Sequence, residues 1–350
     1  MHWLCYQKQL SANLLKNEKK SKDTMMKVNL LDESWPIRGT FTISRGSKTH
    51  AQVIVVELLQ DKYVGRGECV PYARYGESIE SVLAELAPLA VKIEEGLTRQ
   101  QMQSLLPAGA ARNALDCAYW DLECKKYGQR IWQRLAVAMP KPLITAYTLS
   151  LDTPERMKQA AIENAYRPLL KLKLAGKGDV ERVAAVREGA PDARIIVDAN
   201  EGWNEALYLE IVPELVKLKV EMIEQPLPAN NDSALKYLPR PITLCADESC
   251  HDRRSLPHII GRYDMINIKM DKTGGLTEAL ALKEEAEKAG LKIMVGCMLA
   301  TSLAMAPAFM VAQNVQVVDL DGPLLLAKDR EECITFNGSQ MNIYQDALWG

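Results

Sequence analysis

The sequence lacks any CxxC pair, although eight cysteines are scattered through its 350 residues. Cysteines in this arrangement favour reduced thiols in a cytoplasmic protein over a disulfide framework or a zinc site. No run of about 18 apolar residues is present, so we predict no transmembrane helix. Charge of one sign is not in excess either, since the net charge is only −2. We therefore expect neither nucleic acid nor an anionic membrane surface as a partner.

The first 25 residues, "MHWLCYQKQLSANLLKNEKKSKDTM", stand apart from the rest of the chain. They are polar and rich in lysine, and they lack the apolar segment of a secretory signal. We expect a disordered tail here and assign it no function. The remaining length and the overall share of 47% hydrophobic residues suit one large globular domain or two smaller ones.

The N-terminal part of the ordered chain has two different patterns. Residues 26–70 alternate apolar and polar positions, with turns at Gly46 and Asp61, which predicts a β-meander. Residues 77–135 carry apolar positions at helical spacing, in segments that end at a glycine. Strands followed by helices predict an α+β domain over residues 26–140.

Eight short β-rich runs follow, and helical segments separate most of them. The runs are 143–151, 169–175, 193–200, 220–227, 242–249, 265–272, 292–298 and 315–322. One intervening helix is expected to begin with Thr153 as N-cap and Pro154 at its first position. Repeated strand–helix units predict parallel strands, and eight of them predict an α/β fold with a modified TIM barrel, (β/α)7β, over residues 141–322. Residues 323–350 lack a clear long helix and are expected to rejoin the N-terminal domain, which would cap the barrel.

Charged residues mark the ends of the predicted barrel strands. In "LLKLKLA" the alternation of a strand places Lys171 and Lys173 on one face. The other marked strand ends are Asp198, Glu224, Asp247, Lys269 and the pair Asp319 and Asp321. From Lys173 to Lys269 the successive steps are 25, 26, 23 and 22 residues, which is one repeat each. We therefore expect these side chains around the carboxyl-end mouth of the barrel, where active sites of such barrels lie.

Three carboxylates on neighbouring strands would repel one another without a cation. Oxygen ligands from Asp and Glu favour a hard metal such as Mg²⁺, and no His or Cys at these strand ends points to zinc. Lysine is an effective base only when burial or a nearby cation lowers its pKa towards neutrality. Two lysines that flank a metal-bound carboxylate can reach the same carbon from opposite faces. The pattern predicts removal of an α-proton, an ene-diolate that the metal stabilises, and reprotonation on the other face.

Several motifs together resemble those of the enolase superfamily, muconate-lactonising subgroup. They are "KLK", "IVDAN", "EQP", "ADES" and "NIKMDKTGG". With "GECVPYARYGES", "EQPLPA", "CADESCH", "GCML" and "DLDGP", the chain is most similar to the L-Ala-D/L-Glu epimerases, a family of dipeptide epimerases. The likeness runs from about residue 26 to the C-terminus. It implies an Mg²⁺-dependent 1,1-proton transfer at the α-carbon of the C-terminal residue of L-Ala-D/L-Glu, in the turnover of cell-wall (murein) peptides in the cytoplasm.

The resemblance also implies a role for each site residue. Asp198, Glu224 and Asp247 would bind Mg²⁺, and Lys173 and Lys269 would be the acid/base pair. The implied substrate contacts are Lys171 to the reacting carboxylate, Asp319 and Asp321 to the free ammonium group, Arg45 to the glutamate side chain, Thr148 on the first strand, and Cys297 and Leu299 in the loop after the seventh strand.

Other interpretations stay open at this stage. The same site could run another reaction of the superfamily, such as o-succinylbenzoate synthase, muconate cycloisomerase or N-acylamino-acid racemase, or act on a different dipeptide. A barrel that only binds ligands through a metal is a further alternative. Asp319 and Asp321 could begin a turn before Gly322, and Arg45 could be an arginine on a surface hairpin. The sequence leaves the exact dipeptide and the oligomeric state, including a homo-oligomer, undecided.

Overall fold

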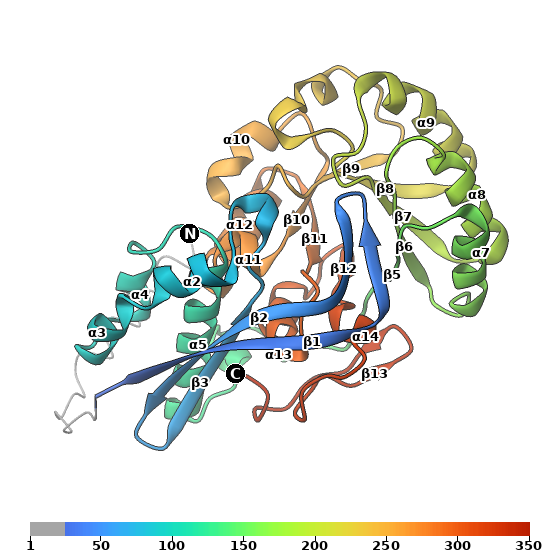
Figure 1. Ribbon diagram of the computed structural model, residues 1–350. Coiled ribbons are helices and arrows are strands. Elements are labelled where there is room, and N and C mark those ends of the chain that lie inside the picture. Colours follow the sequence, from blue (N-terminus) through green and yellow to red (C-terminus); the bar gives the residue numbers. More distant parts are fainter. Residues whose placement is uncertain (1–24) are drawn as a thin grey trace.

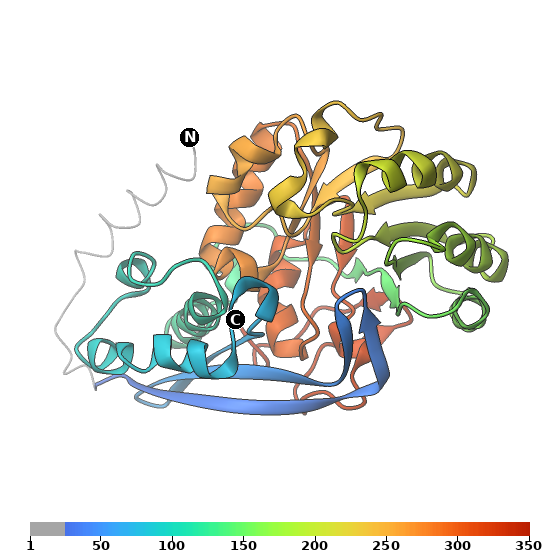
Figure 2. The same cartoon turned by 45° about the horizontal axis from the view of Figure 1, so that its top comes forward.

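The computed structural model describes residues 25–350, which form two parts that lie side by side (Figure 1). One part is an antiparallel sheet with helices against it, and the other is a parallel eight-stranded sheet surrounded by helices. A long hairpin of the first part reaches to the barrel in both views (Figure 2). The predicted tail, residues 1–25, lies outside the described residues except for Met25.

The N-terminal sheet confirms the predicted meander. Its strands run in the order β1 (Lys27–Ile43), β2 (Gly46–Gln60) and β3 (Tyr63–Cys69), each antiparallel to the next. The tight turns fall at the predicted Gly46 and Asp61, which have positive φ values of 138° and 56°. The first turn becomes important below, because it is the end of the hairpin that reaches the barrel.

Five helices follow the sheet, and the predicted helical segment that ends at Gly96 is divided in two. The helices are α2 (Ile79–Leu86), α3 (Leu89–Glu94), α4 (Arg99–Met102), α5 (Ala110–Tyr127) and α6 (Ile131–Arg134). The division falls at Pro88, which has no backbone N–H to continue the helix. Helix α5 packs so closely on β3 that a Cβ atom on Gly67 would lie 2.1 Å from the carbonyl oxygen of Ala114. Glycine is therefore required there by the close approach of two backbones.

All eight predicted barrel strands are present and parallel, which confirms the fold class. They are β5 (Tyr147–Leu149), β6 (Leu169–Lys173), β7 (Arg194–Asp198), β8 (Val220–Glu224), β9 (Thr243–Ala246), β10 (Met265–Ile268), β11 (Lys292–Gly296) and β12 (Val317–Asp319). They lie in chain order around the sheet. The backbone N–H of Ala146 donates to the carbonyl of Val318 at 2.8 Å, so the first and last strands meet and nearly close the barrel.

Helices cover the outside of the barrel. They are α7 (Pro154–Glu163), α8 (Asp179–Gly189), α9 (Glu205–Lys217), α10 (Leu256–Ile259), α11 (Met270–Thr273), α12 (Leu276–Lys288) and α13 (Ser302–Val311). Thr153 caps α7 as predicted, since its side chain accepts a hydrogen bond from Arg156 N. Between β8 and β9 the described chain forms only short 3-10 turns, at Ala229–Asn231 and Ser233–Lys236.

The last segment of the chain returns to the N-terminal part. After α14 (Gly322–Leu325), strands β13 (Phe336–Asn337) and β14 (Gln340–Met341) form a small sheet with β4 (Leu143–Ile144). The indole N–H of Trp349 then donates to the carbonyl of Cys117 in α5 at 3.0 Å.

Strand β6 shows how two lysines fit into an apolar strand. All five of its residues are buried. Leu170 and Leu172 belong to the large core under the outer helices, whereas Leu169 belongs to a separate apolar layer inside the barrel. Because alternate residues share a face, Lys171 and Lys173 continue upward from Leu169 on the inner face. The inner face is thus apolar at the bottom and cationic towards the carboxyl end.

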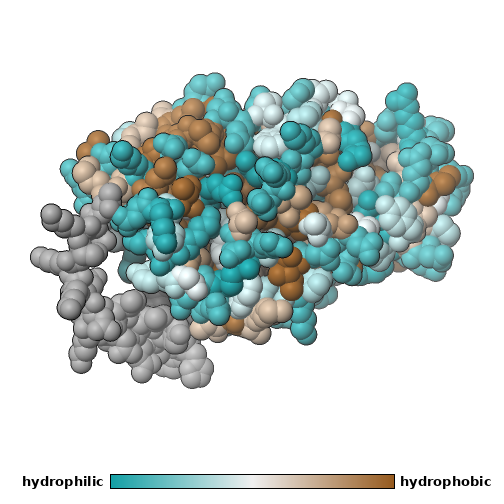
Figure 3. Space-filling view, turned by 90° about the horizontal axis from the view of Figure 1, so that it is seen from below, coloured by the Kyte–Doolittle hydropathy of each residue, from teal (hydrophilic) through white to brown (hydrophobic). Residues whose placement is uncertain are grey.

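No helix within residues 25–350 has the length and apolar character to cross a membrane. The face of the molecule seen from below mixes hydrophilic residues with separate hydrophobic areas (Figure 3).

A buried carboxyl group joins the two parts of the molecule. Asp271 Oδ1, in α11, accepts hydrogen bonds from Val70 N at 3.0 Å and from Asn113 Nδ2 at 2.8 Å, both in the N-terminal part. Burial raises the pKa of Asp271 to about 7, in spite of these two donors. The folded protein therefore keeps a proton on Asp271 at pH values where the unfolded chain has lost it.

This carboxyl group predicts a pH-dependent stability. In the unfolded chain, Asp271 loses its proton at about pH 3.9, whereas the folded protein keeps it to about pH 7. The free energy of unfolding therefore falls as the pH rises between these values, and then levels off. Asp271→Asn keeps an oxygen that accepts both hydrogen bonds but carries no charge. Between pH 5 and pH 8, we expect the wild type to lose about 2–3 kcal/mol of unfolding free energy relative to this variant, measured by urea denaturation. Asp192→Asn is the control, because Asp192 is exposed. The prediction is contradicted if the difference in unfolding free energy between the wild type and Asp271→Asn changes with pH no more than that for the control.

Candidate active site

The predicted strand-end residues meet at the carboxyl end of the barrel. Lys173, Asp198 and Glu224 are the last residues of β6, β7 and β8, and they pair directly in register, Lys173 with Asp198 and Asp198 with Glu224. Asp247 and Lys269 each follow their strands, β9 and β10, by one residue. All five side chains are buried. The one-repeat spacing in the sequence therefore corresponds to neighbouring positions in space.

Acidic and basic groups alternate in this cluster. Lys173 Nζ lies 2.5 Å from Asp198 Oδ2, and Lys269 Nζ lies 2.7 Å from Asp247 Oδ2. Lys171 lies deeper, with its Nζ 2.6 Å from Glu224 Oε2. Each carboxylate is thus compensated by at least one ammonium group at close range, which a low-dielectric site requires.

The three carboxylates offer a donor set that suits a hard divalent cation. Asp198, Glu224 and Asp247 are almost fully buried and supply only oxygen, as Mg²⁺ prefers. Glu224 Oε2 is close to Lys171 but has no well-aligned hydrogen bond within residues 25–350. In the described part of the chain, no three acidic, His or Cys side chains converge on one point, because ammonium groups lie between the carboxylates. The three carboxylates fit Mg²⁺ by their chemistry, and a bound cation would compete with the neighbouring ammonium groups for their oxygens.

Neighbouring carboxylates raise the pKa values of two of the site lysines, Lys269 and Lys171. Burial acts to lower the pKa of Lys269, but the carboxylates of Asp247 and Glu224 outweigh it, so the pKa is well above its ordinary value. The same balance raises the pKa of Lys171, through burial opposed by Asp319, Glu224 and Asp198. For these two lysines, attraction to the neighbouring carboxylates exceeds the cost of burial. The lowering of a lysine pKa by a bound cation stays a prediction.

Two further residues complete the cluster and were not predicted from the sequence. Lys272 is fully buried in α11, and its Nζ donates to Asp247 Oδ1 and to the Asp247 carbonyl, each at 2.6 Å. Asn267 Nδ2 donates to Glu224 Oε1 at 2.7 Å. A signal for Asn267 exists, because it lies two residues before Lys269 and shares its inward face. Lys272 lies beyond the strand, where the period of two no longer applies.

Residues of the first two barrel strands also meet those at the end of the last strand. Lys171 Nζ donates to Asp319 Oδ2 at 2.7 Å, and Thr148 N donates to Asp321 Oδ2 at 2.6 Å. Asp319 Oδ1 is buried without a hydrogen-bond partner in the described structure. Burial and the neighbouring Asp319 raise the pKa of Asp321 to about 7. This pair thus offers an unpaired acceptor and a carboxylate whose charged form is disfavoured. A cationic group nearby would stabilise that charged form.

A cavity of about 470 Å³ lies above the cluster, between the barrel and the N-terminal part. Of the predicted residues, Arg45, Lys173, Lys269, Cys297 and Leu299 line it, together with Asp247. Lys171, Thr148, Asp319 and Asp321 are not part of its wall as described.

Basic side chains outnumber acidic ones in the cavity wall. The basic residues that line it are Arg45, Lys48, Arg74, Lys173 and Lys269, and Asp247 is the one acidic residue among the described lining. A ligand with two anionic groups suits such a wall better than a neutral ligand.

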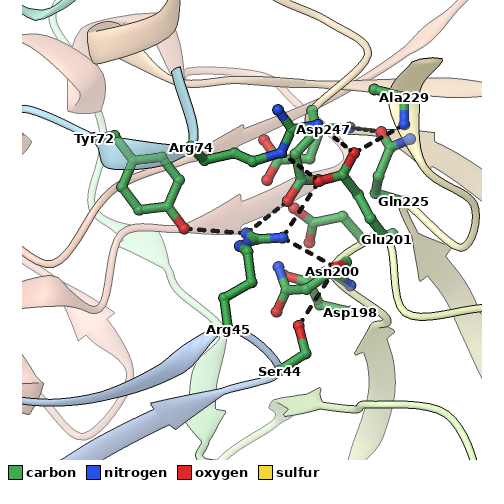
Figure 4. A network of polar contacts seen from close by, with 12 residues as sticks. Ser44, Arg45, Tyr72, Arg74, Asp198, Asn200, Glu201, Gln225, Ala229 and Asp247 are labelled. Carbon is green, nitrogen blue, oxygen red and sulfur yellow. Dashed lines mark hydrogen bonds and ion pairs between the residues drawn. The ribbon is translucent and has the colours of Figure 1, made fainter. Parts of the chain in front are cut away.

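Arg45 projects from the turn between β1 and β2 towards the barrel (Figure 4). It donates to Glu248 Oε1 at 2.8 Å, to the Asn200 carbonyl at 3.0 Å and to the Tyr72 hydroxyl at 3.1 Å. The interpretation of Arg45 as an arginine on a free surface hairpin does not agree with these contacts.

Both parts of the chain match models of known families. Residues 153–332 match the model described as enolase C-terminal domain-like, and residues 25–135 match the N-terminal domain of mandelate racemase and muconate lactonizing enzyme.

Two relatives of known activity are similar over most of the chain. An L-Ala-D/L-Glu epimerase from Escherichia coli (strain K12) is 46% identical over 321 residues, covering 91% of this chain and 100% of the relative. An N-acetyl-D-glutamate racemase from a Pseudoalteromonas species is 45% identical over 305 residues, covering 85% and 95%.

Solved structures show the same fold. An enolase family member from Agrobacterium tumefaciens, with homology to dipeptide epimerases and with bound sodium and L-Ala-L-Glu, has a TM-score of 0.92 and 50% identity, covering 93% of this chain and all of that one. A dipeptide epimerase from Enterococcus faecalis V583, complexed with Mg and L-Leu-L-Tyr, has a TM-score of 0.85 and 28% identity, covering 91% and 97%.

The buried contact of Lys272 predicts a large loss of stability on its removal. Lys272→Met keeps the apolar stem but removes the ammonium group, which leaves Asp247 Oδ1 and two backbone carbonyls without this donor. Removing one partner of a buried ion pair costs about 3–5 kcal/mol, so we expect a loss of this size in urea denaturation. Lys217→Met is the matched control, because Lys217 pairs with Glu214 on the exposed surface and its loss should change stability by less than about 0.5 kcal/mol. Equal effects of the two substitutions would contradict the buried role.

Proposed function

Because the chain belongs to the mandelate racemase and muconate-lactonizing family of the enolase superfamily, we propose that it is an isomerase of the dipeptide epimerase type. Its substrates are L-Ala-L-Glu and L-Ala-D-Glu, which it interconverts by moving a proton at the α-carbon of the glutamate. The similarity to the E. coli epimerase and to the A. tumefaciens structure with L-Ala-L-Glu supports this choice of substrate.

The observation that carries the proposal is the placement of Lys173 and Lys269. They extend from β6 and from the end of β10, which are four strands apart in an eight-stranded barrel and so lie on opposite sides of it. Both line the same cavity. An α-carbon held between them can lose its proton to one amine and receive a proton from the other on the opposite face, which inverts the centre.

Asp198, Glu224 and Asp247 would hold the divalent cation, which we propose to be Mg²⁺ as in the E. faecalis structure. When bound, Mg²⁺ would stabilise the negative charge that develops on the substrate carboxylate as the α-proton leaves. Lys272 and Asn267 keep Asp247 and Glu224 in place through their hydrogen bonds. Lys171, between Glu224 and Asp319, would contribute positive charge beside the substrate carboxylate.

The two ends of the dipeptide have complementary groups. Arg45, on the cationic cavity wall, would bind the side-chain carboxylate of the glutamate by a charge-assisted contact. Asp319 and Asp321 would bind the free ammonium group of the alanine, since one of their oxygens is buried and unpaired. Thr148 positions Asp321 through its backbone N–H, and Cys297 and Leu299 would close the side of the pocket.

Such an activity would serve the turnover of cell-wall peptides in the cytoplasm. The cysteines in the described part of the chain are all unpaired, as suits a reducing compartment.

A second candidate function is racemisation of N-acetylglutamate. The Pseudoalteromonas racemase is nearly as similar as the E. coli epimerase. Its substrate class shares the two carboxylates but has no free ammonium group. The buried, unpaired oxygen of Asp319 favours the dipeptide.

The two-base arrangement predicts a different defect for each lysine. In D₂O with Mg²⁺, the wild type should incorporate deuterium at the α-carbon from either epimer. Lys173→Ala should reduce incorporation from one epimer, and Lys269→Ala from the other, each by at least about 100-fold. Exchange is followed by NMR, and Lys177→Ala, an exposed lysine after β6, is the control. The scheme fails if both variants exchange both epimers at the wild-type rate.

The acidic pair of the last strand predicts which substrate is used. Replacing Asp319 and Asp321 with Asn removes their charge but keeps oxygens that accept hydrogen bonds. We expect kcat/KM for L-Ala-L-Glu to fall about 100-fold, because an ion-paired ammonium contact is lost, while any turnover of N-acetylglutamate changes little. If N-acetylglutamate is the better substrate of the wild type and the substitutions leave it unaffected, the racemase is the correct function.

A further inference from the structure

The turn that follows β7 has an unusual backbone. Asn200 and Glu201 have φ values of 45° and 66°, in the left-handed region that residues other than glycine rarely adopt. Such a conformation costs of the order of 1 kcal/mol or more per residue and persists only where surrounding contacts require it. Within the barrel, Asn200 N donates to Asp198 Oδ1 at 2.9 Å. From the N-terminal part, Arg45 donates to the Asn200 carbonyl and to the Glu201 carboxylate.

Glu201 gathers donors from three separate segments. Arg74 binds it with two hydrogen bonds, from Nε to Oε2 and from Nη2 to Oε1, each 2.7 Å long. Ala229 N donates to Oε1 at 2.8 Å, and Arg45 Nη1 lies 3.4 Å from Oε2. Figure 4 shows Glu201 between the two arginines. A two-bond pair of this kind fixes the plane of a guanidinium group as well as its position.

The carboxylates lie behind the arginines as seen from the cavity. Arg45 and Arg74 line the cavity wall, whereas Glu201 and Glu248, which hold them, do not. The acidic groups therefore orient the two guanidinium groups without placing negative charge on the wall. A substrate in the cavity would meet the positive groups.

We propose that Glu201 is a positioning residue that sets the selectivity of the site for an acidic side chain. It acts through Arg74 and Arg45, which it holds against the cavity, and it does not contact the substrate itself. This inference rests on the proposed function, because it assigns the acidic side chain to the C-terminal residue of a dipeptide.

A purely structural role for the ion pair between Arg74 and Glu201 would have different consequences. Arg74 keeps 35% and Glu201 10% of its side chain exposed, and an ion pair of this exposure contributes little to the free energy of unfolding. Glu201→Gln should therefore fold, because its amide oxygen can still accept from Ala229 N. A clamp that only joins the two parts of the molecule would affect every substrate alike.

The test compares substrates that differ in one charge. For Glu201→Gln we expect KM for L-Ala-L-Glu to rise about tenfold, with kcat within about threefold of the wild type, because hydrogen bonds between charged groups are weakened. KM for L-Ala-L-Gln, which is uncharged and of similar shape, should change by less than about twofold. Glu201→Asp, which keeps the charge on a shorter chain, should recover part of the lost affinity.

The control is Glu221→Gln, because Glu221 makes a similar two-bond pair with Arg194 far from the cavity. It should leave both KM values unchanged. Arg74→Gln should reproduce the effect of Glu201→Gln, and the double variant should be no worse than either single variant, as for residues that act as one unit. Equal changes of KM for both dipeptides, or additive effects of the two substitutions, would overturn the proposal.

A second measurement does not depend on the substrate. Arg45 is bound to barrel residues in the folded protein, so trypsin should cleave after it mainly when the turn between β1 and β2 leaves the barrel. In the full-length protein, Glu201→Gln should speed cleavage after Arg45 about tenfold over the wild type and Glu221→Gln, as followed by mass spectrometry. If the wild type fails to exchange L-Ala-L-Glu but cleavage responds as expected, the proposed substrate is wrong and Glu201 still positions the turn. Unchanged cleavage would refute the positioning role itself.

Discussion

Burying carboxylates and ammonium groups together at the mouth of the barrel is the constraint from which the rest of the structure follows. Removing a charge from water costs several kcal/mol, and only a close partner of opposite sign offsets this cost. Asp198, Asp247 and Glu224 are all nearly inaccessible, and each lies within ion-pair distance of a lysine. The barrel can place them so because successive strand ends lie side by side. The apolar layer below, to which Leu169 and Met222 belong, supports the cluster and keeps water from it.

The barrel and the charged cluster could be predicted from the sequence because both follow simple periods. A strand has a period of two and a strand–helix unit a period near 25 residues, so Lys173, Asp198 and Glu224 had to converge once the fold was assigned. Capping residues also predicted where a helix begins, as Thr153 did for α7. The division of one predicted helix at Pro88 was missed, because the apolar spacing continues across the proline.

What the sequence could not show depends on contacts between distant segments. Lys272 reaches Asp247 from a short helix whose orientation no period describes. Arg45 and Arg74 meet Glu201 across 156 and 127 residues, and nothing in any of the three segments marks the other two as neighbours. The pKa of Lys269 likewise depends on how far its carboxylate neighbours compensate burial, which only the packed structure reveals. The cavity wall is therefore a joint product of the two parts of the molecule.

The alternation within β6 has a consequence for how this protein can change in evolution. Since neighbouring residues of a strand face opposite sides, one residue inserted directly before Leu170 would turn Lys171 and Lys173 outward beneath the helices and bring Leu170 and Leu172 into the site. No single point substitution could restore the arrangement. Length variation among descendants of this chain must therefore be confined to the connections between strands, while the strand itself can change in composition but not in length.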